Sequence, residues 1–120
     1  MAESPNLNFN NIIKQIIKKS LFTERQIEII LNQLNLQKTN FTITKGAYYR
    51  QVNQSREKLL GLYYSVILLK GLGVLVPEDI DVINRLSEQV SVIQNSDVFP
   101  EREYEIISVI ESLVNRACRL

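Results

Sequence analysis

The sequence predicts an all-α protein, a single compact domain of about five helices over residues 1–120. Three observations indicate this class. Only four glycines and three prolines interrupt 120 residues, which suits a few long elements and few turns. Apolar residues recur at helical spacing along most of the chain. A hydrophobic fraction of 45% is typical of a folded chain of this length with one core.

The first two helices are predicted from an apolar stripe and a capping motif. Residues 1–7 show no periodicity, so we expect them to lie outside the helices. From Asn8, a stripe predicts an amphipathic helix with its lysines off the stripe. The stripe consists of Ile12, Ile13, Ile16, Ile17 and Leu21. Thr23 is the expected N-cap of the second helix, with Gln26 at the capping-box position, and this helix extends to about Leu36. We expect it to bury Ile27, Ile30, Leu31 and Leu34.

The other three helices are marked by their ends. Segment 38–43 is polar and β-branched and predicts an extended connector. Thr44 is the expected N-cap of a third helix of about 26 residues, 45–70, which ends at the glycines that follow. Pro77 and Pro100 each precede acidic residues, a combination that favours a helix start. The last two helices, about 77–95 and 100–118, are expected to form a helical hairpin.

The net charge of +1 conceals an asymmetry between the two halves of the chain. Residues 1–60 contain nine Lys and Arg against four acids, and residues 61–120 contain five against nine. Within the one domain we therefore distinguish a basic N-terminal part, 8–75, from an acidic C-terminal helical pair, 77–120. The asymmetry indicates an anion-binding surface on the basic part. An uneven, solvated surface is the alternative.

The first half of the third helix carries the functional prediction. With Val52 at the middle of its buried face, the opposite side presents small residues and then long side chains with several donors. A helix that enters the major groove needs such a surface, because Arg, Gln and Asn make paired contacts with base edges. An ordinary solvated helix face is the alternative. The predicted DNA-binding residues are Thr44, Lys45, Gly46, Ala47, Tyr49, Arg50, Gln51, Gln54 and Lys58, with Lys45, Tyr49 and Lys58 placed to reach phosphates.

Residues 43–59, ITKGAYYRQVNQSREKL, resemble the recognition helix in the fourth region of sigma factors of the extracytoplasmic-function type. Residues 21–27, LFTERQI, resemble the opening of the first helix in the same domain. The positions that match the family pattern in order are Ile43, Thr44, Lys45, Gly46, Ala47, Tyr48, Val52, Ser55, Arg56, Lys58 and Leu59. The resemblance covers about residues 20–60 and implies a helix-turn-helix unit that binds DNA.

The chain also departs from that family. Its members have a short helix between these two elements, whereas segment 37–42 is too short and too β-branched for one. No part of the chain resembles the sigma regions that bind polymerase. The resemblance therefore implies an abridged helix-turn-helix relative and not a sigma factor. Archaeal helix-turn-helix proteins of unassigned role look similar.

The second half of the third helix is apolar on every side from Leu59 to Leu69. We expect such a helix to be buried on more than one face, and Gly61 would let another backbone approach. We expect Tyr63 and Tyr64 to pack in the core, although tyrosines also stack on bases in single-strand binders. The excess apolar surface leaves room for a homodimer.

Catalytic and metal-binding motifs are lacking in the sequence. The chain has no His, which excludes His-based catalysis and His metal sites. We therefore expect no enzyme activity, no cofactor and no small-molecule substrate. The single cysteine, Cys118, suits a reducing compartment. The sequence shows no signal peptide and no apolar stretch of membrane-spanning length, so we expect a cytoplasmic protein without a membrane partner.

We conclude from the sequence that the chain binds double-stranded DNA, as a transcription regulator or a chromosome-associated factor. One alternative is a non-catalytic helical adaptor or small subunit of a larger complex. Another is a protein that binds single-stranded nucleic acid.

Overall fold

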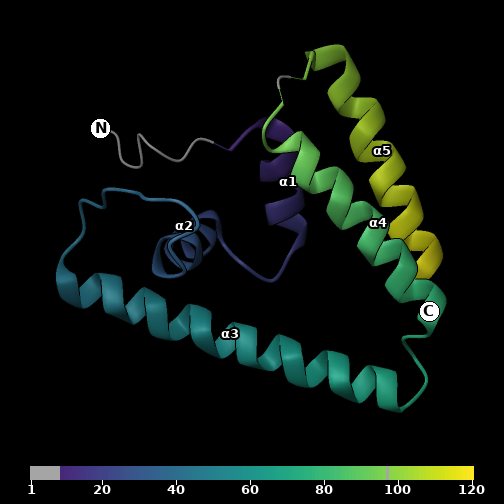
Figure 1. Cartoon of the computed structure of the whole chain (residues 1–120), viewed down its shortest axis with the longest axis horizontal. Helices are drawn as coiled ribbons and strands as arrows, with labels where there is room; N and C mark the ends of the chain where they lie inside the picture. Colours follow the sequence, from purple (N-terminus) through teal and green to yellow (C-terminus); the bar gives the residue numbers. More distant parts are fainter. Residues whose placement is uncertain (1–8, 97) are drawn as a thin grey trace. The chain divides into compact units, whose positions relative to one another are not determined.

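The computed structural model describes residues 9–96 and 98–120, and these form five α-helices with no strand among them (Figure 1). The helices are α1 (Asn11–Lys19), α2 (Glu24–Gln33), α3 (Lys45–Gly71), α4 (Pro77–Ile93) and α5 (Pro100–Ala117). The predicted all-α class is confirmed. The predicted non-helical segment 1–7 lies outside the described residues.

The chain divides into two compact units, and the boundary passes through α1 and α3. Unit 1 contains Ile16–Ser65 of the described residues, whereas unit 2 contains Phe9–Gln15 and Val66–Leu120. The sequence did not indicate this division, because the two parts distinguished there meet in the loop before α4. Each unit is described by itself below.

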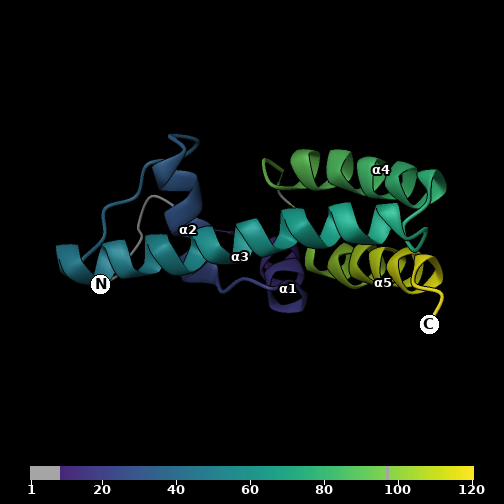
Figure 2. The ribbon, with the colours of Figure 1, turned by 90° about the horizontal axis from the view of Figure 1, so that it is seen from below.

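Local capping residues fix the starts of α2 and α3 where the sequence predicts them. Thr23 Oγ1 accepts the Gln26 amide at 3.1 Å, and Gln26 Oε1 accepts the Thr23 amide at 3.0 Å, so the capping box is formed. Thr44 Oγ1 accepts the Ala47 amide at 3.0 Å. From there α3 continues unbroken for 27 residues, about 40 Å at the helical rise (Figure 2).

Both α2 and α3 end in a left-handed residue that satisfies the last carbonyls. Beyond α3, Gly73 has φ +82°, and the Val74 amide donates to the Leu69 carbonyl at 2.8 Å. Beyond α2, Asn35 has φ +59°, and the Leu36 amide donates to the Leu31 carbonyl at 2.9 Å. This bonding pattern is the Schellman motif, in which glycine is usual and asparagine is occasional. It ends α2 at Gln33, earlier than the sequence predicts.

The core of unit 1 is small and centred on Ile17 and Ile29, which are 8% and 1% exposed. The buried face of α2 therefore differs from the predicted one. It is centred on Ile29, whereas Ile27, Ile30 and Leu31 are only half-buried. Leu34 is 60% exposed, because it lies past the end of α2 in the Schellman turn. The prediction that Leu34 is buried is wrong.

Unit 2 contains the helical hairpin, in which α4 and α5 run side by side (Figures 1 and 2). Asp79 caps α4, because its carboxylate accepts the Val76 amide at 3.0 Å. The Arg119 guanidinium lies 3.8 Å from that carboxylate and also donates to the Val74 carbonyl. At the other end of α4, the Asn10 side-chain amide donates to the Ile93 carbonyl at 2.9 Å. The predicted C-terminal hairpin is thus present, and side-chain interactions hold α4 at both of its ends.

The second half of α3 is not buried on more than one face, so that prediction is wrong. Leu60, Tyr63, Tyr64, Ile67 and Leu68 are between 40% and 72% exposed. The expected core packing of Tyr63 and Tyr64 is likewise wrong, since they are 67% and 72% exposed. Among the described residues, no helix is both long and apolar enough to cross a membrane.

Candidate nucleic-acid interface

The start of α3 is fixed against the end of α2 through Tyr48. The Tyr48 hydroxyl accepts the Asn32 side-chain amide at 2.8 Å and donates to Gln33 Oε1 at 2.7 Å. The ring of Phe41, from the connector, packs at a tilt on Tyr48 with centroids 5.3 Å apart. Asn32 Oδ1 in turn accepts the Thr39 amide at 3.2 Å. These bonds orient α3 within unit 1 and hold the connector in place.

The buried side of the first half of α3 is centred on Ser55 and not on Val52. Ser55 is 2% exposed, whereas Val52 is half-buried. At about 100° per residue the two positions differ by about 60° around the helix. The rotation follows from the contacts of Tyr48 and Lys58, which lie on the Ser55 side of Val52 and face unit 1. The buried side of α3 therefore lies about 60° around the helix from the predicted one.

The rotation divides the predicted DNA-binding residues into two groups. Ala47 and Gln51 turn toward unit 1 and are half-buried. The residues that stay exposed are Thr44, Lys45, Gly46, Tyr49, Arg50 and Gln54. Thr44 is exposed, but its hydroxyl caps α3.

Two residues outside the predicted DNA-binding set lie on the exposed side. Asn53 and Glu57 are both exposed. Asn53 follows Arg50 by three residues and Glu57 follows Asn53 by four, so the three side chains are neighbours along one face. The position of Ser55 at the centre of the buried side, which the apolar pattern does not show, moves Asn53 from the flank of the helix to its exposed side, whereas Glu57 is exposed with either centre. We define the exposed α3 face as Gly46, Tyr49, Arg50, Asn53, Gln54 and Glu57.

Lys58, predicted to reach a phosphate, makes intramolecular hydrogen bonds on the side of α3 that faces unit 1. Its ammonium donates to the Leu21 carbonyl and to Gln26 Oε1, both at 2.8 Å, and lies 5.9 Å from the centre of the Phe22 ring. Gln26 is the residue that closes the capping box of α2. Lys58 therefore ties α3 to the start of α2 inside unit 1.

Packing against the described residues does not require glycine at position 46. A Cβ atom added there would meet no atom within 4 Å, and the residue does not adopt a left-handed conformation. Glycine lowers the stability of a helix relative to alanine, by about 0.5–1 kcal/mol in the middle of the helix. A surface that needs close approach by another molecule would account for a glycine at this position.

The charges around the exposed α3 face are mixed along its length. Lys45, Arg50 and Arg56 are exposed basic residues, and the positive end of the helix dipole lies beside Lys45. Glu57 is the first acidic residue on this helix. The basic character therefore ends about three turns into α3. The described residues contain no cluster of His, Cys, Asp or Glu suited to a metal ion.

The arrangement of α2 and α3 shares one property with a helix-turn-helix and departs in another. The two helices run steeply to one another, as the helices of that motif do: α2 is seen nearly end-on in Figure 1, where α3 lies across the view, and stands steeply to α3 in Figure 2. However, residues 34–44 separate them, whereas the motif uses a turn of about three or four residues. Segment 37–42 is irregular, as predicted, with no intervening helix. Comparisons of this chain with protein-family models, with curated proteins and with solved structures find no match.

Proposed function

We propose that the chain binds double-stranded DNA through the exposed α3 face, as a non-catalytic transcription regulator or chromosome-associated factor. One observation carries the proposal: Gly46, Arg50, Asn53 and Gln54 lie exposed on the first three turns of a helix whose opposite side is fixed to α2. Small residues at a helix start followed by Arg and amide side chains are what a major-groove helix requires.

The proposed contacts differ in kind along the helix. Lys45, at the positive end of the dipole, binds a phosphate, and the bare backbone at Gly46 lets the duplex approach. Arg50 matches the two acceptors of guanine, and the amides of Asn53 and Gln54 match the donor and acceptor of adenine. Glu57 repels phosphate and so limits the contact to the first part of the helix.

A titration of labelled duplex, single strand and RNA at two salt concentrations tests this class of ligand. Duplex affinity should fall steeply with salt, because Lys and Arg displace condensed counterions. Lys45→Glu should weaken binding to every duplex alike, whereas Lys38→Glu, an exposed lysine of the connector, should weaken it less. Absence of duplex binding by the wild type at low salt would refute the proposal.

A helical adaptor or small subunit of a larger complex is the second candidate. It is favoured by the exposed apolar side chains Leu60, Tyr63, Tyr64, Ile67 and Leu68 of α3, which suit a protein partner. Exposed tyrosines are also compatible with stacking on single-stranded bases, so the single-strand arm of the titration separates that alternative.

We also propose a cytoplasmic location and a homodimer. Cys118 is a free, exposed thiol, which suits a reducing compartment. A two-fold dimer would present two α3 helices to paired half-sites, the arrangement that small helix-turn-helix proteins use.

A further inference from the structure

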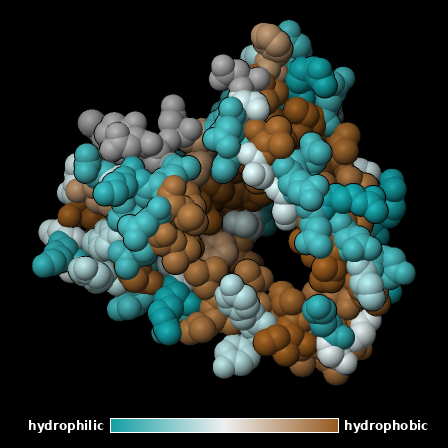
Figure 3. Space-filling view, viewed as in Figure 1, coloured by the Kyte–Doolittle hydropathy of each residue, from teal (hydrophilic) through white to brown (hydrophobic). Residues whose placement is uncertain are grey.

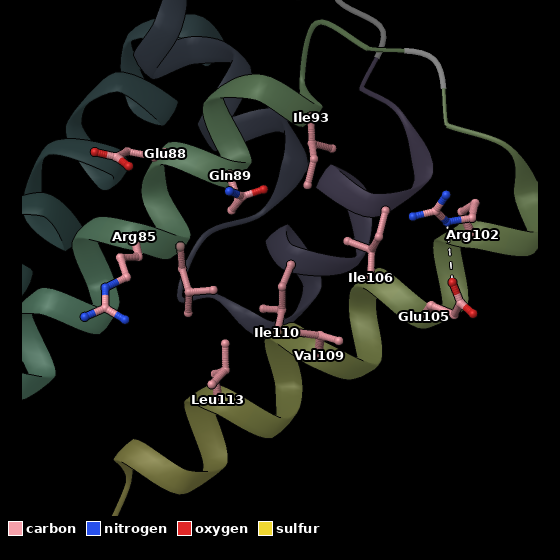
Figure 4. Close-up of a pocket in the computed structure, with 11 residues that line it drawn as sticks. Arg85, Glu88, Gln89, Ile93, Arg102, Glu105, Ile106, Val109, Ile110 and Leu113 are labelled. Carbon is pink, nitrogen blue, oxygen red and sulfur yellow. Dashed lines mark ion pairs between the residues drawn. The ribbon is translucent and has the colours of Figure 1, made fainter.

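An apolar groove runs between α4 and α5 in unit 2 (Figure 4). Its volume is about 700 Å³. The apolar residues that line it are Leu86, Ile93, Ile106, Val109, Ile110 and Leu113. Figure 4 shows Ile106, Val109, Ile110 and Leu113 of α5 along one side and Ile93 of α4 on the other. Val109 is 58% exposed, so the groove is open to solvent in the single chain.

We propose that a second copy of this chain covers the groove, with the α4–α5 hairpins of the two copies packing face to face as a four-helix bundle. A two-helix layer with an open apolar face is half of such a bundle, and side chains of the facing layer fill the space between its helices. The proposal specifies the interface of the proposed homodimer and does not depend on DNA binding.

The charges at the rim of the groove match those of a second copy. Each helix contributes one Arg and one Glu: Arg85 and Glu88 from α4, and Arg102 and Glu105 from α5. The rim therefore carries no net charge and does not select a strongly acidic or basic partner. A second copy therefore meets the rim without net repulsion, and the presence of both Arg and Glu on each helix allows oppositely charged contacts across a two-fold axis.

The size of the open face fits a second copy better than a small molecule. Helices of 17 and 18 residues are about 26 Å long, and two neighbouring helices form a layer about 20 Å wide. The face then measures roughly 500 Å² per copy, or about 1,000 Å² in total, near the lower limit for a specific interface. An interface of that size is compatible with a dimer that dissociates on dilution.

The hydropathy of the surface agrees with an exposed apolar face on this hairpin. Figure 3 shows hydrophobic side chains among hydrophilic ones over α4 and α5. The charged side chains of Arg102 and Glu105, paired at 3.4 Å, stay in solvent at the rim, being 67% and 70% exposed.

Sedimentation equilibrium without DNA, from about 5 to 200 µM protein, tests the interface. The wild type should pass from 13.9 kDa to twice that mass as concentration rises. Val109→Glu should weaken the dimer by at least about 100-fold, because it places a charge in the apolar groove. Val109 is exposed in the single chain, so the variant should keep its fold, which circular dichroism checks.

Asn115→Glu is the matched control. Asn115 is an exposed α5 residue that does not line the groove, and the charge change is the same. It should dimerise like the wild type. A wild type that stays at 13.9 kDa throughout, or a Val109→Glu variant that dimerises as the wild type does, would overturn the proposal. Either result leaves the DNA titration unaffected, so the two proposals fail separately.

Discussion

Replacing Lys58 by methionine is expected to lower the free energy of unfolding of unit 1 by about 2 kcal/mol. The Lys58 ammonium donates to the Leu21 carbonyl and to Gln26 Oε1, each at 2.8 Å. A hydrogen bond that involves a charged group contributes about 1.5–3 kcal/mol when buried. The bond to Leu21 is exposed and that to Gln26 only partly buried, so solvent reduces the sum to about 2 kcal/mol. Methionine keeps the length of the apolar stem and removes only the donors.

Thermal unfolding followed by circular dichroism measures this loss. For a unit of this size, about 2 kcal/mol corresponds to a fall in melting temperature on the order of 10 °C. Lys45→Met is the control, since Lys45 is exposed at the start of the same helix; it should melt no lower than the wild type, because it removes a positive charge from the positive end of the helix dipole. Duplex affinity should respond in the opposite way, falling for Lys45→Met and little for Lys58→Met under conditions where both are folded. If Lys58→Met melts like the wild type and binds duplex as weakly as Lys45→Met, the intramolecular role of Lys58 is refuted.

Three further substitutions test the packing and the exposed α3 face. Tyr48→Phe removes a hydroxyl with two amide partners on α2 and should cost about 1 kcal/mol in urea unfolding, whereas Tyr49→Phe, at an exposed ring, should be neutral. Ser55→Ala removes a buried hydroxyl that has no hydrogen-bond partner among the described residues and should stabilise the protein by about 1 kcal/mol; a loss of that size would show that the hydroxyl is bonded. Arg50→Ala or Asn53→Ala should cost about 1–3 kcal/mol on a preferred duplex selected from random sequence and far less on random DNA. Equal losses of binding free energy on the preferred and the random duplex would indicate that Arg50 and Asn53 contact phosphates and not bases.

The features that the sequence predicts well are those with a local cause. Thr23 and Thr44 cap helices through bonds to residues three positions away, and Pro77 begins a helix through its own fixed φ. These signals lie within one turn of chain. The all-α class and the starts of α2 to α5 therefore follow from the sequence, whereas α1 begins at Asn11 and not at Asn8 as predicted.

The end of α2 shows how a local signal can be missed. Asn35 ends the helix in the left-handed conformation, a position that glycine usually occupies. In a sequence, asparagine does not by itself mark the end of a helix. The apolar residue after Asn35 therefore predicts a longer α2. Asparagine tolerates this conformation better than other non-glycine residues, and that tolerance was the available signal.

The orientation of α3 was missed for a non-local reason. Val52 is the more apolar residue, yet Ser55 is the buried one, because Tyr48 and Lys58 bond to α2 residues 16 and 32 positions away. A small residue such as serine also lets a neighbouring segment pack closely. Apolar periodicity does not contain these contacts. As a result Asn53 was omitted from the predicted site, while Lys58 and Gln51 were included in it.

The most direct test of duplex binding by the exposed α3 face is a ¹⁵N–¹H correlation spectrum titrated with a short duplex at low salt. The backbone amides of residues 45–54 and the side-chain amides of Asn53 and Gln54 should shift in proportion to bound DNA. The amide resonances of α4 and α5 should not shift, and raised salt should reverse the shifts of the α3 resonances. An unchanged spectrum at duplex concentrations of several hundred micromolar, or shifts confined to α4 and α5, would contradict DNA binding by this helix.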